Sequence, residues 1–280
     1  MPSAATTPAA IIPIDSLTAS PKTGVIESLR CGNDIIRFTG GGCEFGDWYG
    51  FFSHERLGGN RVTINKCEVN SAQDRANGTI VVALPCGEYE FRFDDRLDAG
   101  TLRRTYHLKS VGVGAMGDMV IRSAVRAADF QRGDIAGRAP AHVGLNRFMQ
   151  HETSSARLIG NGIELAFDAD VPDAPGRLGM YTYLRDQPDG QWIMHHRLLT
   201  ECAASDEYVL RVRHAAYSSK SSFWVKSLRG VLWRACEKHP WIRPTIQVGG
   251  NIIMKPGETW TMSSTIRVVR RETRGATATP

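Results

Sequence analysis

The sequence has no long apolar run and no leader pattern. Its longest uncharged apolar stretches fall well short of the about 18 to 20 residues that a membrane-spanning helix requires. The N-terminus, residues 1–10, is rich in Ala, Thr and Pro, and the apolar run at residues 11–14 is too short for the core of a secretory signal. We therefore expect no membrane partner and a cytoplasmic location by default. Export by a route that the sequence does not display stays open.

The cysteines form no pattern that is typical of a metal site. The chain has six of them, without a CxxC motif or a Cys/His cluster at zinc-ligand spacing: Cys31, Cys43, Cys67, Cys86, Cys202 and Cys236. Cytosolic cysteines are reduced and mainly buried, whereas a disulfide stays open if the protein is exported. The glycine run at residues 112–117 lies between two predicted strands with no helix after it, which argues against a dinucleotide loop. We expect neither a metal nor a cofactor.

The sequence also lacks a large excess of charged residues of one sign. The 280 residues include 34 basic and 29 acidic side chains, for a net charge of +5 and a pI near 9.0. This mild excess attracts anions but is far from the concentrated basic surface of a nucleic-acid-binding protein, so we expect no nucleic-acid partner. The hydrophobic share of 42% is sufficient for a large core.

Helical periodicity is scarce, and its best example is the segment 223–236, which is followed by Pro240 and Pro244. Elsewhere, short alternating segments bounded by Gly, Pro, Asn or Asp predict strands. These lie at residues 34–38, 61–69, 79–84, 89–93, 102–110, 119–127, 162–167, 178–185, 191–199, 208–217, 245–253 and 260–269. The sequence therefore predicts an all-β fold, an antiparallel β-sandwich with at most one or two short helices.

Composition divides the chain into three parts. Residues 1–24 and 272–280 carry Ala, Thr, Ser and Pro with few large apolar groups, so we expect a flexible N-terminal arm and a flexible C-terminal tail. Between them, residues 25–271 are expected to form a single sandwich domain with loops at 40–60 and 129–155. The first loop carries Trp48 among several aromatic residues. It either contacts a ligand or packs as a flap over an open end of the sandwich.

Several long strands carry charged residues along one face, at residues 88–94, 102–108 and 118–126. A Pro-Gly turn at residues 256–257 then leads into a closing strand. In this strand rhythm, over residues 80–270, the chain resembles the galactose mutarotase-like supersandwich of sugar epimerases and of β domains in polysaccharide lyases. The resemblance implies a protein with a sugar-related function.

The segments 178–185, 191–199 and 208–217 are joined by short connections, which predict an antiparallel meander. Side chains alternate between the two faces of such a sheet. One face is apolar and includes Trp192, Leu198, Leu210 and Val212. The other combines arginine, tyrosine and histidine without an acid: Tyr181, Tyr183, Arg185, Ile193, His195, Arg197, Arg211, Arg213 and Tyr217.

Two histidines, His196 and His214, fall on the apolar face of this predicted meander. They are either a metal pair or neutral core histidines that hydrogen-bond to their neighbours. No Asp or Glu on that face completes a ligand set, which favours the core histidines.

The opposite, cationic face predicts an anion site, because like charges on neighbouring strands are destabilising unless something compensates them. Arginine binds carboxylate, sulfate or phosphate in bidentate fashion, and tyrosine offers a ring to a sugar. The alternative is that acids on other strands, for example Glu88, Glu90, Asp94 or Glu164, pair with these arginines.

We interpret the protein as carbohydrate-active, binding or acting on an anionic sugar or polysaccharide by lyase- or epimerase-type chemistry. His195 or His107 would act as the base and Tyr183 as the acid. The predicted substrate-binding residues are Tyr181, Arg185, Arg197, Arg211, Arg213, Tyr217 and Trp48. Two other classes stay open. One is a non-catalytic virion or surface subunit, whose terminal arms would suit contacts within a homo-oligomer, and the other is a small-molecule isomerase or cyclase.

Overall fold

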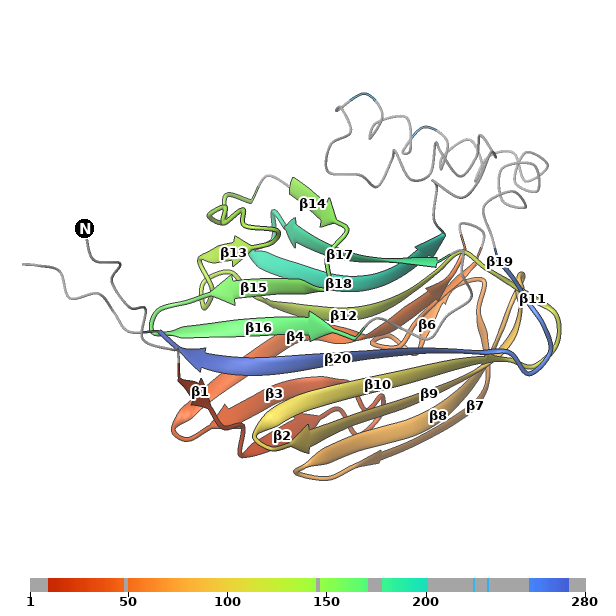
Figure 1. Cartoon of the computed structure of the whole chain (residues 1–280). Helices are drawn as coiled ribbons and strands as arrows, with labels where there is room; N and C mark the ends of the chain where they lie inside the picture. Colours follow the sequence, from red (N-terminus) through yellow and green to blue (C-terminus); the bar gives the residue numbers. More distant parts are fainter. Residues whose placement is uncertain are drawn as a thin grey trace, which may run out of the picture.

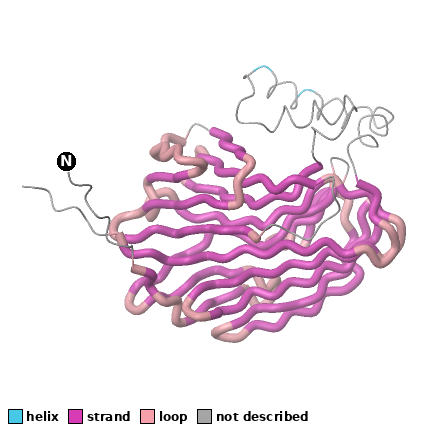
Figure 2. Tube along the Cα trace, in the orientation of Figure 1, coloured by secondary structure: helices cyan, strands magenta, loops and turns pink. Residues whose placement is uncertain are grey.

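The computed structural model describes residues 10–47, 50–144, 147–170, 178–200 and 252–271, and the single positions Trp224 and Val231. Strands make up most of this part of the chain, and loops lie mainly where strands end (Figure 2). The strands form two large antiparallel sheets, so the predicted all-β antiparallel sandwich is confirmed. Among the described residues, no helix is long and apolar enough to cross a membrane.

The first sheet has the strand order β13-β15-β16-β20-β10-β9-β8-β7, with β1 paired to β20. Figure 1 shows β20 between β16 and β10, so the strand that comes last in the described sequence lies inside the sheet. Its strands are β1 (Ile11–Ile12), β7 (Thr63–Ser71), β8 (Arg75–Leu84), β9 (Gly87–Asp98), β10 (Thr101–Ser110), β13 (Arg132–Asp134), β15 (Ser155–Ile159), β16 (Ile163–Ala169) and β20 (Thr259–Arg270).

The second sheet has the order β14-β17-β18-β12-β4-β3-β2, with the short strands β5 and β6 added beside β4. Its strands are β2 (Ser16–Ala19), β3 (Ile26–Cys31), β4 (Asp34–Gly46), β5 (Phe51–Ser53), β6 (Gly58–Asn60), β12 (Asp118–Arg126), β14 (Arg147–His151), β17 (Leu178–Asp186) and β18 (Gln191–Thr200). A separate two-stranded ribbon pairs β11 (Gly114–Met116) with β19 (Ile252–Met254).

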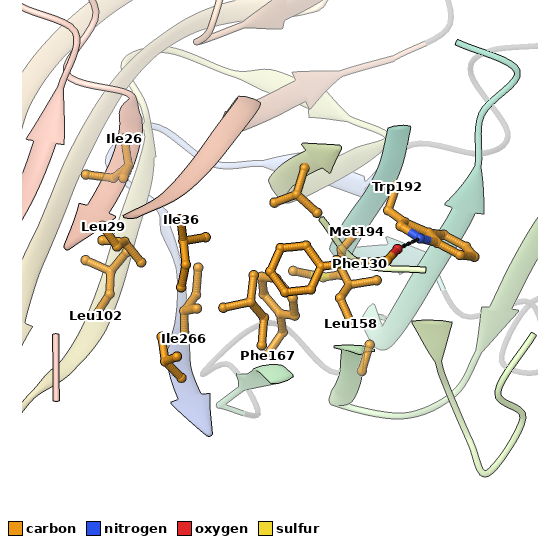
Figure 3. Packing of buried hydrophobic residues seen from close by; sticks show 14 of the residues in the cluster. Ile26, Leu29, Ile36, Leu102, Phe130, Leu158, Phe167, Trp192, Met194 and Ile266 are labelled. Carbon is orange, nitrogen blue, oxygen red and sulfur yellow. Dashed lines mark hydrogen bonds between the residues drawn. The ribbon is translucent and has the colours of Figure 1, made fainter. Parts of the chain in front are cut away.

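The core lies between the two sheets, because each contributes the apolar half of its alternating side chains. One cluster contains Leu102 and Phe167 of the first sheet with Trp192 and Met194 of the second (Figure 3). Trp192 satisfies its indole N–H by donating to the Phe130 carbonyl at 2.6 Å. A second cluster joins aromatic residues of β9 and β10 to residues of β4, β12 and β18. Burial of these apolar side chains is the main stabilising term of the fold.

A charged network crosses this core. Arg104 on β10 is 2% exposed, and its Nε atom lies 3.3 Å from an oxygen of Asp95 on β9. It also donates to Ser123 Oγ and to the Arg122 carbonyl on β12 of the second sheet, both at 3.0 Å. Tyr106 accepts from Arg104 and donates to Asp95. The network therefore ties the two sheets together through hydrogen bonds as well as through apolar contact.

Two regions differ from the sequence-based expectations. Residues 10–24 were expected in a flexible arm, but they contain β1 and β2, and Ile14 and Leu17 are buried in the core. Residues 40–60 were expected in a loop, but the end of β4 and the hairpin β5–β6 occupy much of this range. The glycines that suggested a loop lie in β4, where Gly40, Gly41 and Gly42 pair with residues of β12.

Some expectations lie outside the described residues. These are the strand at 208–217, nearly all of the helix at 223–236, most of the strand at 245–253 and the tail at 272–280. The predicted loop at 129–155 contains the short strands β13 and β14. For the remaining predicted strands, the structure has strands at closely similar positions.

Candidate functional site

The candidate site lies on the outer face of the second sheet, opposite the core. In β17 and β18 the alternation predicted from the sequence is confirmed, because Thr182, Leu184, Trp192 and Leu198 are fully buried between the sheets. The residues between them point to the other face. His196, at 0% exposure, is a core histidine as the sequence favours. Its Nδ1 atom lies 3.1 Å from Thr182 Oγ1, which itself donates to the Thr153 carbonyl.

Strand register places the outer-face residues in rows. Tyr183 on β17 lies opposite His195 on β18, and His195 lies opposite Arg122 on β12. In the next row, Tyr181 lies opposite Arg197. Side chains that are directly opposite on antiparallel strands have Cβ atoms about 4.5 to 5.5 Å apart. The site is therefore built on adjacent strands and needs no loop to bring its central residues together.

His195 is at the centre of these rows. Its ring lies 5.0 Å from the ring of Tyr183, with an angle of 31° between the planes. The Nε2 atom of His195 is buried and has no hydrogen-bond partner among the described residues. Burial, and then the charges of Arg197, Arg122 and Arg185, hold the pKa of His195 well below 6.5. The imidazole is therefore neutral at pH 7 and offers an unused nitrogen to a ligand.

Arg197 is held by a carboxylate from the neighbouring strand. Its Nη2 atom lies 2.5 Å from Asp118 Oδ2, and only 5% of the residue is exposed. Acids on other strands thus do accompany the arginines of this face, as the alternative interpretation required. They are not the suggested ones, since Glu88, Glu90 and Asp94 lie on β9 and Glu164 lies on β16, all in the first sheet. The face is therefore mixed in charge and not purely cationic.

Arg122 has two acidic partners. Its Nη1 atom forms an ion pair with Glu55 in the turn between β5 and β6, and its Nε atom lies 4.0 Å from Glu44 on β4. Glu55 also accepts a hydrogen bond from the Gly41 amide at 3.2 Å. A Cβ atom at Gly40 would lie 2.6 Å from Glu55 Oε2 and 2.7 Å from Arg122 Nη1. Because Gly40 has no side chain, it leaves room for the ion pair of Glu55 and Arg122.

Glu44 completes the ionisable set. Its pKa is raised above the usual value, chiefly by burial and further by the neighbouring carboxylates of Asp118 and Glu55, while Arg122 opposes the change. A carboxyl with a raised pKa can deliver a proton more readily near neutral pH than an ordinary glutamate. The site therefore combines a neutral imidazole with an acidic group in reach of the same arginine.

Not all predicted residues meet here. Tyr181, Tyr183, Arg185, His195 and Arg197 share this face, whereas Arg211, Arg213, Tyr217, Trp48 and His214 lie outside the described residues. His107 is on β10, between the buried residues Tyr106 and Leu108, so it points to the outer face of the first sheet. There it borders two hollows of about 360 and 260 Å³. His107 and His195 therefore cannot act on one substrate.

Sequence reasoning missed Glu44, Glu55, Asp118 and Arg122. A signal existed for Arg122, because it stands between the apolar Ile121 and the buried Ser123 in a predicted strand. Its pairing with β18, about seventy residues later, has no local signal. Within the described residues, no group of three or more His, Cys, Asp or Glu side chains could hold a metal ion.

Comparisons with solved structures agree with this architecture. A galactose mutarotase related enzyme from Lactobacillus acidophilus is similar, with 10% sequence identity, a TM-score of 0.51, and coverage of 92% of this chain and 94% of that chain. A galactose mutarotase-like protein from Lactobacillus casei has 10% identity and a TM-score of 0.48, with coverage of 92% and 100%. No family model matches the sequence, and no curated protein matches it. At such low identity, the first likeness shows a shared fold alone, the one that the strand rhythm predicts.

Proposed function

We propose that this chain, which has the fold of a galactose mutarotase related enzyme, binds a sugar on the outer face of its second sheet and transfers protons on it. The observation that carries the proposal is the unpartnered, buried Nε2 atom of neutral His195, surrounded by three arginines and the ring of Tyr183. Buried polar atoms are nearly always hydrogen-bonded, so an exception in the middle of a charged face is best explained by a ligand that completes it.

The roles follow from the protonation states. His195 accepts a proton, because it is neutral and its lone pair is unused. Glu44, whose pKa is raised, supplies the proton on the other side of Arg122. The ring of Tyr183, which is 5% exposed, packs beside the imidazole of His195 and limits how that ring can turn. A base and an acid with pKa values moved apart by their surroundings are what epimerisation or elimination requires.

The charges favour an anionic sugar. Three arginine side chains, Arg197, Arg122 and Arg185, lower the pKa of His195, although Asp118 and Glu55 pair with the first two. A carboxylate on the sugar would neutralise part of this positive field and so raise the pKa of His195, which makes the imidazole a stronger base only when substrate is bound. The same arginines would stabilise the enolate-like charge that forms when a proton is removed beside a carboxylate. A uronate sugar therefore fits this face better than a neutral hexose.

The test is proton exchange at the carbon next to the carboxylate. A hexuronate is incubated with the protein in D2O, and loss of its C5 proton signal is followed by NMR beside a calorimetric titration. We expect His195→Gln to slow exchange by about a hundredfold or more, since removal of a general base costs roughly 10² to 10⁴ in rate. Binding of the hexuronate should stay within about tenfold.

His107→Gln is the matched control, because it changes the same residue type on the opposite face of the sandwich and should leave exchange unchanged. A neutral hexose measured in parallel shows whether the carboxylate matters. If neither sugar binds, or if the His107 and His195 variants behave alike, the proposal is wrong.

A further inference from the structure

Strand β7 is an unusually long open edge. It ends the first sheet and pairs only with β8 among the described strands. It has nine residues, whereas the edge strands β2, β13 and β14 have four, three and five. In the described part of the chain, no backbone hydrogen bond joins residues 63–71 to anything other than β8. Natural sheets usually keep such edges short, because unpaired backbone groups invite another strand.

We propose that β7 pairs antiparallel with β7 of a second copy of this chain, with Cys67 on the two-fold axis, so that the first sheets of two molecules join into one. The sequence of β7 is self-complementary about this point. Cys67 is the middle residue of the nine, and it is exposed. Pairing centred on it places Lys66 opposite Glu68 of the second copy.

The charges of Lys66 and Glu68 favour the register that is centred on Cys67. In one molecule, Lys66 and Glu68 lie on the same face of the strand, with Lys66 Nζ 3.0 Å from Glu68 Oε2, and their side chains are 52% and 62% exposed. In the proposed pair each lysine faces a glutamate of the other chain, and this occurs twice because of the symmetry. Opposite charges directly across antiparallel strands are stabilising, and like charges there are destabilising. A slip by two residues would lose both matched pairs.

Lysines and bulges on an edge strand usually prevent association, and β7 has one of each. Its bulge lies at Asn65, between Ile64 and Lys66, and the Asn65 side chain donates to Glu88 of its own molecule at 2.9 Å. The bulge therefore confines the regular pairing to the segment that follows it. Lys66 does not repel a second copy in the proposed register, because Glu68 neutralises it. The result is a small interface and a weak, concentration-dependent dimer.

Charge reversal tests the register. Molecular mass is measured by light scattering after size exclusion, at protein concentrations up to about 0.1 mM. We expect a dimer whose Kd rises about tenfold or more in Lys66→Glu and in Glu68→Lys, because each variant places like charges opposite one another. The double variant K66E/E68K restores both opposite-charge pairs and should regain the original Kd. Lys109→Glu, an exposed change on the face of β10, should leave the Kd unchanged.

A short bis-maleimide linker checks the contact at Cys67. It should produce a covalent dimer of the native chain and none of Cys67→Ser, while Cys67→Ser still associates in solution. A monomer at every concentration overturns the proposal. So does a dimer that the single charge reversals leave intact, or a double variant no tighter than the singles. Circular dichroism on each variant verifies that the fold is retained.

Discussion

Arg197 shows how the partner of one side chain changes its expected role. On alternation alone it is an arginine aimed at a ligand, whose replacement would spare the fold. In the structure its guanidinium is almost completely buried beside Asp118, whose side chain is 21% exposed. Burial of an ion pair makes each member depend on the other, because a charge left alone there is poorly solvated. Arg197 therefore stabilises the fold, in addition to any contribution that it makes to ligand binding.

We expect Arg197→Gln to lower the free energy of unfolding by about 2 kcal/mol, less than for a fully buried pair because water reaches Asp118. Urea denaturation measures this. Arg103→Gln is the control, since Arg103 pairs with Asp170 at 3.5 Å in a solvent-exposed setting and should cost less than about 0.5 kcal/mol. Equal losses of unfolding free energy in the two variants would show that the pair of Arg197 and Asp118 contributes no more to stability than an exposed ion pair.

At the scale of strands, the network of Asp95, Arg104 and Tyr106 joins β9 and β10 to β12 across the core. Apolar packing tolerates small sliding of one sheet over the other, but hydrogen bonds of defined direction do not. The same contact links the core to the site, because Arg104 donates to the backbone carbonyl of Arg122. The side chain of Arg122 in turn holds Glu55 on the outer face. The network thus fixes the strand that carries part of the site.

We expect Asp95→Asn and Arg104→Met each to cost about 3 kcal/mol or more, because each leaves its partner buried without compensation. The double variant should lose clearly less than the sum of the two, by about 1 kcal/mol or more. The exposed pair Arg75 and Asp94, on β8 and β9, is the control and should show nearly additive losses. Additivity in the buried pair would contradict a coupled network. If one single variant fails to fold, folding of the double variant supports the coupling.

The strands that could be predicted from the sequence are those whose residue types alternate with a clear period of two, such as β17, β18 and β20. The site could be predicted only in part, since alternation places Tyr183, His195 and Arg197 on one face. It does not say which strand lies beside them. Glu44 was hidden in a stretch that three glycines made look like a loop. Gly40 is instead needed where Glu55 and Arg122 cross β4, and Gly42 lies close to His54 with a positive φ.

At the scale of the whole molecule, two buried histidines couple folding to pH. Burial lowers the pKa of His54 and of His196 to about 3. In the unfolded chain both titrate near 6.5. Between these values the unfolded state binds more protons than the folded state. The stability that they contribute is therefore complete above about pH 6.5 and is lost as the pH falls toward 3.

We expect the melting temperature to fall as the pH is lowered from 7 to 4, and to fall less steeply in the variant H54Q/H196Q. Glutamine can donate a hydrogen bond, as His54 does to the Thr23 carbonyl, but it does not titrate. The comparison of the two slopes removes the contribution of the carboxylates, which is common to both proteins. Parallel curves for the native chain and the variant would refute the histidine coupling.

The place of β20 has a consequence for biosynthesis. Strands β7 to β10 and strands β13, β15 and β16 meet only through β20, which is translated after all of them. While residues 259–270 are still inside the ribosome, the first sheet is divided into two parts. The edge strands β10 and β16 of these parts lack the partner strand with which both pair in the folded protein. Such unpaired edges, beside exposed aromatic side chains such as Tyr106 and Phe167, promote aggregation. Slow translation of the codons for residues 259–270 would prolong that exposure until β20 emerges.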